Sequence, residues 1–61
     1  MPQVIVEMKE GRTIEQKKQL VENITAAFTK IGTRPETVFV LLRDNPKHNW
    51  GVGGKLSSEK S

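Results

Sequence analysis

The chain has no cysteine, a single histidine and only three aromatic residues among its 61. Without cysteine it can form neither a disulfide scaffold nor a thiolate metal site. The lone histidine, His48, excludes a zinc site built on several imidazoles. A chain of this length buries only about 60% of its unfolded surface, so its own core is small. We therefore expect a single domain, residues 1–61, that completes its core by packing against copies of itself.

Long apolar segments are also missing. No run approaches the ~20 residues that span a bilayer, so no membrane partner is expected. The N-terminal MPQVIVEMKEG has no basic segment before its apolar stretch and no cleavage pattern, which makes the cytoplasm the expected compartment. A net charge of +3 is mildly basic and favours anionic ligands without naming one.

Two short segments have the composition of strands. Residues 3–8 (QVIVEM) are β-branched and partly alternating, and residues 38–42 (VFVLL) are apolar on both faces. Between them, Thr13 and Gln16 have the spacing of a capping box, which predicts a helix that begins at Ile14. Gly32 is placed to end this helix. The expected apolar stripe of the helix consists of Leu20, Val21, Ile24, Ala27, Phe28 and Ile31.

The order strand, helix, strand predicts an α+β fold built on a β-α-β unit with parallel strands. One helix covers only one face of such a sheet. The other face, with some of Val4, Val6, Phe39 and Leu41, is expected to form a subunit interface. Beyond a polar loop at residues 44–49, residues 50–54 (WGVGG) predict a short hairpin or an extended arm. Residues 55–61 are polar and expected to be frayed.

Three residues could carry chemistry. Pro2 would become a free secondary amine if Met1 were removed, and apolar surroundings would lower the pKa of that amine from the usual 7.7–8.0 or so. Such a base could move protons near neutral pH, although a proline at this position is more often inert. Arg12 could hold a carboxylate, or be a solvated surface arginine. Trp50 could be the apolar wall of a site or an interface anchor.

Taken together, these features resemble a known family. The Met-Pro start, the segment EGRTIEQK at residues 10–17 and the segment NWGVGG at residues 49–54 are similar to the 4-oxalocrotonate (2-hydroxymuconate) tautomerases. The resemblance covers nearly the whole chain, in order.

The resemblance implies the following roles. Pro2 would be the general base in the enol–keto tautomerisation of an unsaturated 2-hydroxy acid, with no cofactor and no metal. Arg12 would bind a carboxylate of a small substrate, and Trp50 would line the site and keep it dry. The family further implies a homohexamer, a trimer of dimers, whose sites are built from neighbouring subunits.

One position departs from the family pattern. Where members of the family carry a second arginine in the second strand, this chain has Phe39. Arg43 lies four residues on, so it points to the same strand face, roughly 13 Å along. Arg43 could reach the site, bind a different carboxylate or do neither.

Two other functions stay open at this point. The chain could be a non-catalytic assembly protein that keeps the fold. It could also be a small basic nucleic-acid-binding protein, although its basic residues are scattered and no binding motif is present. We expect no nucleic-acid partner.

Overall fold

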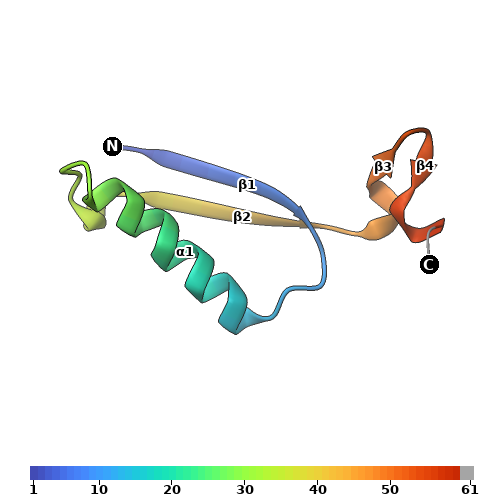
Figure 1. Cartoon of the computed structure of the whole chain (residues 1–61), viewed down its shortest axis with the longest axis horizontal. Helices are drawn as coiled ribbons and strands as arrows, with labels where there is room; N and C mark the ends of the chain where they lie inside the picture. Colours follow the sequence, from blue (N-terminus) through green and yellow to red (C-terminus); the bar gives the residue numbers. More distant parts are fainter. Residues whose placement is uncertain (60–61) are drawn as a thin grey trace.

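A β-α-β unit followed by a small hairpin makes up residues 1–59, the part of the chain that the computed structural model describes (Figure 1). Strand β1 spans Gln3–Lys9, helix α1 spans Ile14–Thr29 and strand β2 spans Phe39–Asn45. The two strands pair in parallel, with Gln3 opposite Phe39 and Lys9 opposite Asn45. The predicted β-α-β unit with parallel strands is confirmed.

Strand β2 extends further than its apolar composition predicts. It begins one residue later than expected and continues through the polar residues Asp44 and Asn45. The Asn45 side chain donates hydrogen bonds to Glu7 Oε1 and to the carbonyl of Met8, both at 3.1 Å. The expected polar loop is therefore reduced to a 3-10 turn, η2, at Lys47–Asn49. Another 3-10 turn, η1, spans Pro35–Thr37 before β2.

The capping box that begins α1 is present. Thr13 Oγ1 accepts the Gln16 N–H at 3.1 Å, and Gln16 Oε1 accepts the Thr13 N–H at 2.9 Å. At the other end the Thr33 N–H bonds to the Phe28 carbonyl at 3.1 Å, and Gly32 has a φ of 97° that a side chain would strain.

The stripe of α1 that faces the sheet differs in part from the predicted one. The half-buried residues of the helix are Lys17, Leu20, Val21, Ile24, Thr25 and Phe28. Ala27 is exposed, and Ile31 is 77% exposed because the chain has left the helix at that point. Ile14 is also exposed, at 79%.

The core lies between α1 and one face of the sheet. Met8, at 7% exposure, is the only buried side chain among residues 1–59. Lys17 at the start of α1 forms an ion pair with Asp44 at the end of β2, which holds the helix across the strands. The half-buried sheet residues on this side are Val4, Val6, Val40 and Leu42.

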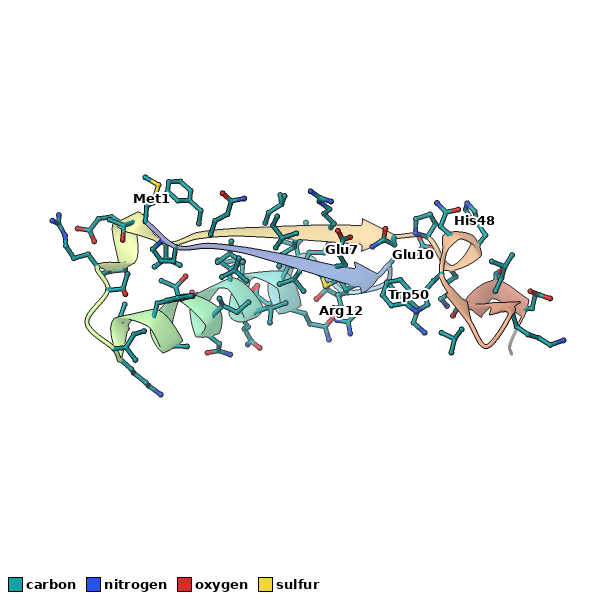
Figure 2. All side chains as sticks on the ribbon, turned by 90° about the horizontal axis from the view of Figure 1, so that it is seen from above. Met1, Glu7, Glu10, Arg12, His48 and Trp50 are labelled. Atoms are coloured by element: carbon teal, nitrogen blue, oxygen red, sulfur yellow. The ribbon has the colours of Figure 1, made fainter. Side chains whose placement is uncertain are left out.

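The opposite face of the sheet carries no helix (Figure 2). Its apolar residues are Ile5, Phe39 and Leu41, which are 45%, 52% and 47% exposed. Phe39 and Leu41 are therefore on the face predicted to be bare, whereas Val4 and Val6 face the helix. Three apolar side chains side by side at this exposure leave a surface that water solvates poorly.

The C-terminal segment is more ordered than predicted. Strands β3 (Gly51–Val52) and β4 (Lys55–Leu56) form an antiparallel hairpin, and Ser57–Glu59 forms a 3-10 turn, η3. The expectation of a frayed segment was wrong for residues 55–59, because Glu59 Oε2 accepts the Leu56 N–H at 2.7 Å. Residues 60 and 61 of that expectation lie outside the described residues. Across the described range, no helix combines the length and apolarity needed to cross a membrane.

The capping box generates a stability prediction. Thr13→Ala removes the hydroxyl that accepts the Gln16 N–H, so we expect the free energy of unfolding to fall by about 1 kcal/mol. Urea denaturation followed by circular dichroism, at one fixed protein concentration, measures the change. Gln19→Ala, at an exposed position in the middle of the same helix, is the control and should change stability by less than about 0.5 kcal/mol. Equal effects of the two substitutions would contradict the prediction.

Candidate active site

Pro2 and Phe39 lie together at one end of the sheet. The Pro2 carbonyl accepts the Phe39 N–H at 3.0 Å, because the parallel pairing begins at this point. Pro2 is half-buried, while Met1 before it is 91% exposed. The Phe39 ring is about half exposed on the bare face of the sheet. Pro2 is thus partly shielded from water within one chain.

Arg12 and Trp50 lie at the other end (Figure 2). Arg12 follows Gly11, whose φ of 125° turns the chain out of β1, and its Nη1 donates to the Lys9 carbonyl at 3.3 Å. Trp50 follows η2 and is half-buried. The Trp50 carbonyl accepts the Ser57 N–H at 2.7 Å, which closes the base of the hairpin.

The two pairs of residues are far apart within one chain. Strand β1 runs from Gln3 to Lys9, and at ~3.3 Å per residue this separates its ends by roughly 20 Å. No side chain spans that distance. A site that contains both Pro2 and Arg12 therefore requires more than one copy of the chain.

Arg43 has a partner inside the chain. It lies on the same sheet face as Phe39, as predicted, and opposite Glu7 in the register. Arg43 Nη1 is 3.0 Å from Glu7 Oε2, and about half of each side chain is exposed. Arg43 is therefore paired with Glu7 within the chain, and its role toward a substrate stays a prediction.

Two residues that the sequence reasoning missed connect the hairpin to β1. Glu10 Oε2 accepts the Lys47 N–H at 3.2 Å, and Lys9 Nζ donates to Ser57 Oγ at 3.3 Å. These contacts fix the segment that carries Trp50 beside the segment that carries Arg12. The sequence signal that could have identified Lys9 and Glu10 was their position, because both come directly before Gly11 and Arg12.

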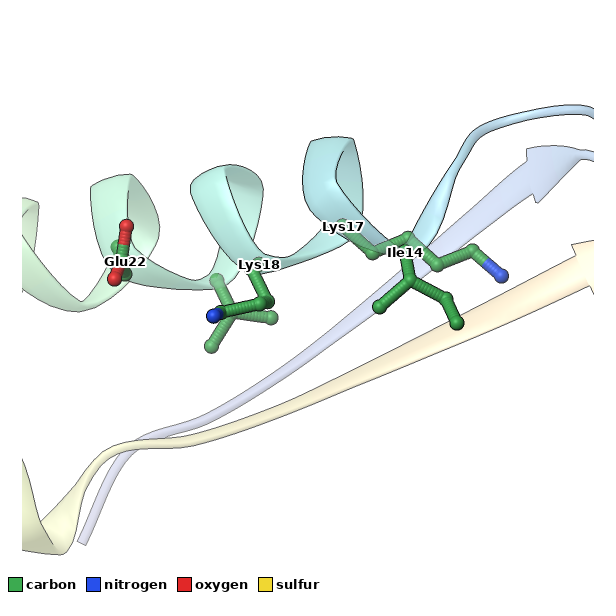
Figure 3. Close-up of a pocket in the computed structure, with 5 residues that line it drawn as sticks. Ile14, Lys17, Lys18 and Glu22 are labelled. Atoms are coloured by element: carbon green, nitrogen blue, oxygen red, sulfur yellow. The ribbon is translucent and has the colours of Figure 1, made fainter.

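Neither His48 nor the cavity beside α1 adds to this arrangement. His48 is exposed within η2. The cavity, of about 350 Å³, contains none of the predicted site residues (Figure 3). It is lined by Ile14, Lys17, Lys18, Val21 and Glu22. Residues 1–59 hold no group of three or more histidine, cysteine or acidic side chains that could bind a metal ion.

Comparison with known proteins identifies the family. A family model described as tautomerase enzyme matches residues 2–60. This chain belongs to the tautomerase family. The tautomerase is 46% identical over 61 residues to a probable tautomerase of Bacillus cereus, with 98% of this chain and 100% of that one covered. It is 40% identical over 60 residues to a 2-hydroxymuconate tautomerase of Comamonas testosteroni, with 97% and 95% covered.

Solved structures agree with the fold of this tautomerase. A homologue of 4-oxalocrotonate tautomerase, YwhB, superimposes with a TM-score of 0.90 at 39% identity, over 98% of this chain and 100% of the other. A 4-oxalocrotonate tautomerase isozyme of Methylibium petroleiphilum gives a TM-score of 0.87 at 40% identity, over 93% and 94% of the two chains. The tautomerase is accordingly an isomerase with the β-α-β fold of these proteins.

The Glu10 contact generates a prediction about the position of Trp50. Glu10→Ala removes the acceptor of the Lys47 N–H, so Trp50 should become more exposed and its fluorescence emission should shift to longer wavelength. Glu10→Gln keeps an acceptor oxygen at the same place and should keep the wild-type emission. Trp50 is the only tryptophan, so the spectrum reports this site alone. An unchanged emission in Glu10→Ala would show that Glu10 does not position the segment.

Proposed function

We propose that this tautomerase interconverts the enol and keto forms of an unsaturated 2-hydroxy acid of the 2-hydroxymuconate type, with Pro2 as general base. The observation that carries the proposal is the place of Pro2, half-buried directly before β1, where its carbonyl accepts the Phe39 N–H. Partial burial of an amine at that position would disfavour its charged form. Relatives named 2-hydroxymuconate tautomerase, at 40% and 42% identity, support the choice of substrate.

The reaction is an internal proton transfer. Once Met1 is removed, the neutral amine of Pro2 takes the proton of the 2-hydroxyl group, and the O–H bond breaks as the C2 carbonyl forms. The amine then returns the proton to a carbon of the diene, so the product is an isomer and no cofactor is consumed. Arg12 binds a substrate carboxylate and stabilises the charge that develops toward the carbonyl oxygen. Trp50 and Phe39 exclude water from the amine.

The proposed site is completed by assembly. Because Pro2 and Arg12 lie at opposite ends of β1, we assign them to one site from different subunits of a homohexamer, arranged as a trimer of dimers. The bare sheet face with Ile5, Phe39 and Leu41 supports association. A structural neighbour from Chloroflexus aurantiacus, 29% identical, is a heterohexamer 4-oxalocrotonate tautomerase.

Replacing the secondary amine of Pro2 by the primary amine of alanine tests the proposed base. The assay is the ketonisation of 2-hydroxymuconate, followed by its ultraviolet absorbance, with protein shown by mass to begin at Pro2. Pro2→Ala should lower kcat/KM by about 10²-fold or more, since the primary amine of alanine lacks the fixed ring geometry of proline and should lose most of the 10²–10⁴ that a well-placed general base typically contributes.

Pro35→Ala is the control for the loss of a proline. It lies in η1, outside the proposed site, and should keep wild-type turnover. Turnover in Pro2→Ala equal to that of wild type would refute the proline mechanism. Absence of turnover in wild type, with assembly intact, would favour the non-catalytic alternative.

Mixed assemblies test whether subunits share a site. Pro2→Ala and Arg12→Ala proteins should each be nearly inactive alone. Co-refolded in equal amounts, they should regain about a quarter of wild-type activity. With random assortment of subunits, one site in four receives both an intact Pro2 and an intact Arg12. If one chain supplied both residues, each chain in the mixture would carry a defect and no activity would return. Equal mixing of Pro2→Ala protein with itself at the same concentration is the control.

A further inference from the structure

We propose that Asn45 is a positioning residue of the tautomerase site, which fixes the Arg12 guanidinium through the end of β1. The inference rests on the proposed function, in which Arg12 acts on the substrate. Asn45 has no part in the proposed mechanism, and it lies where β2 continues beyond its apolar residues.

The Asn45 side chain uses both of its amide hydrogens at the end of β1. Its Nδ2 donates to the Met8 carbonyl and to Glu7 Oε1, both at 3.1 Å. Asparagine is the smallest side chain with two N–H donors on one atom, whereas aspartate has none. Asn45 is half-buried, so water competes less for these bonds than at an exposed position. The two bonds together require an amide here.

The backbone of Asn45 holds the next residue of the same strand end. Its carbonyl accepts the Glu10 N–H at 2.9 Å. Because Met8 comes before Lys9 and Glu10 comes after it, these bonds hold Lys9 from both sides. The Lys9 carbonyl in turn accepts the hydrogen bond from Arg12 Nη1 at 3.3 Å. The acceptor that orients the guanidinium is therefore kept in place by Asn45.

Arg12 depends on this strand end for its direction. Its side chain is exposed, and within residues 1–59 it forms no ion pair. Glu10 and Arg12 both lie where β1 ends (Figure 2). On the other side of Arg12, the Thr13 cap fixes the start of α1. Arg12 thus connects two fixed points, and Asn45 supplies the bonds that fix the one in the sheet.

Hydrogen exchange tests the positioning without any substrate. In Asn45→Ala the Glu10 amide, followed by NMR, should exchange about tenfold faster than in wild type, because the side-chain bonds that hold the end of β1 are lost. The Phe39 amide bonds to the Pro2 carbonyl at the other end of the ladder and should keep its wild-type rate. Unchanged exchange at Glu10, or equal acceleration of both amides, would overturn the inference.

Kinetics test whether this position matters to the reaction. Asn45→Ala should lower kcat/KM for 2-hydroxymuconate about tenfold, since a displaced cation stabilises the transition state less well. Asn45→Asp has the same size but no N–H donor, and should lower kcat/KM at least as much. Wild-type turnover in Asn45→Asp would show that Asn45 only fills space. Asn23→Ala, which removes an exposed asparagine from α1, is the matched control and should keep wild-type turnover.

A double-mutant cycle separates the positioning of Arg12 from a role in the fold alone. In the Arg12→Ala background, Asn45→Ala should change kcat/KM by less than about twofold, because the guanidinium that Asn45 positions is absent. A tenfold loss in both backgrounds would mean that Asn45 acts on folding or assembly, and the inference would be wrong.

Failure of the inference can be distinguished from failure of the proposed function. Faster exchange at Glu10 alone supports the role of Asn45 even if wild type does not turn over 2-hydroxymuconate, a result that refutes only the proposed function. Turnover in wild type that is unchanged in Asn45→Ala refutes the role of Asn45 and leaves the proposed function intact.

Discussion

The parallel pairing of β1 with β2 is the constraint on which the rest of the structure depends. A parallel pair cannot be closed by a tight turn, so the chain needs a long crossover, which α1 supplies. The helix then covers one face and leaves the other bare. Because Pro2 comes directly before β1 and Arg12 comes after it, the length of the paired strand keeps these two residues at opposite ends of the sheet. The thin core and the separation of Pro2 from Arg12 have a common origin.

The C-terminal hairpin depends on a small number of polar contacts. Glu10 and Lys9 each make one hydrogen bond to the segment after β2, beyond the ladder that ends at Asn45. Individual hydrogen bonds of this kind contribute about 1 kcal/mol. The position of Trp50 is therefore held less strongly than that of Pro2, whose segment belongs to the paired strands. The apolar wall of the proposed site is the part most easily altered by substitution.

Most of the fold could be predicted from the sequence because local signals agreed with each other. The Thr13–Gln16 box and Gly32 mark the two ends of the helical region, and β-branched residues mark both strands. The end of β2 was missed, since Asn45 joins the strand through side-chain bonds to Glu7 and Met8 that depend on the pairing itself. The ordered structure of residues 55–59 was missed for a similar reason. The Glu59 carboxylate accepts its hydrogen bond from the Leu56 N–H, a contact that forms with the hairpin.

Less of the candidate site than of the fold could be predicted from the sequence. A motif can indicate Pro2, Arg12 and Trp50, but it does not show that Arg43 is bound by Glu7. That pair follows from the strand register, which places Glu7 opposite Arg43.

The distance between the two ends of β1 also determines how a defective subunit affects the activity of an assembly. In an assembly where each chain gives its Pro2 to one site and its Arg12 to another, a misfolded copy impairs a neighbour as well as itself. Loss of function then spreads beyond the faulty subunit, and a minority of defective chains lowers activity by more than its own share.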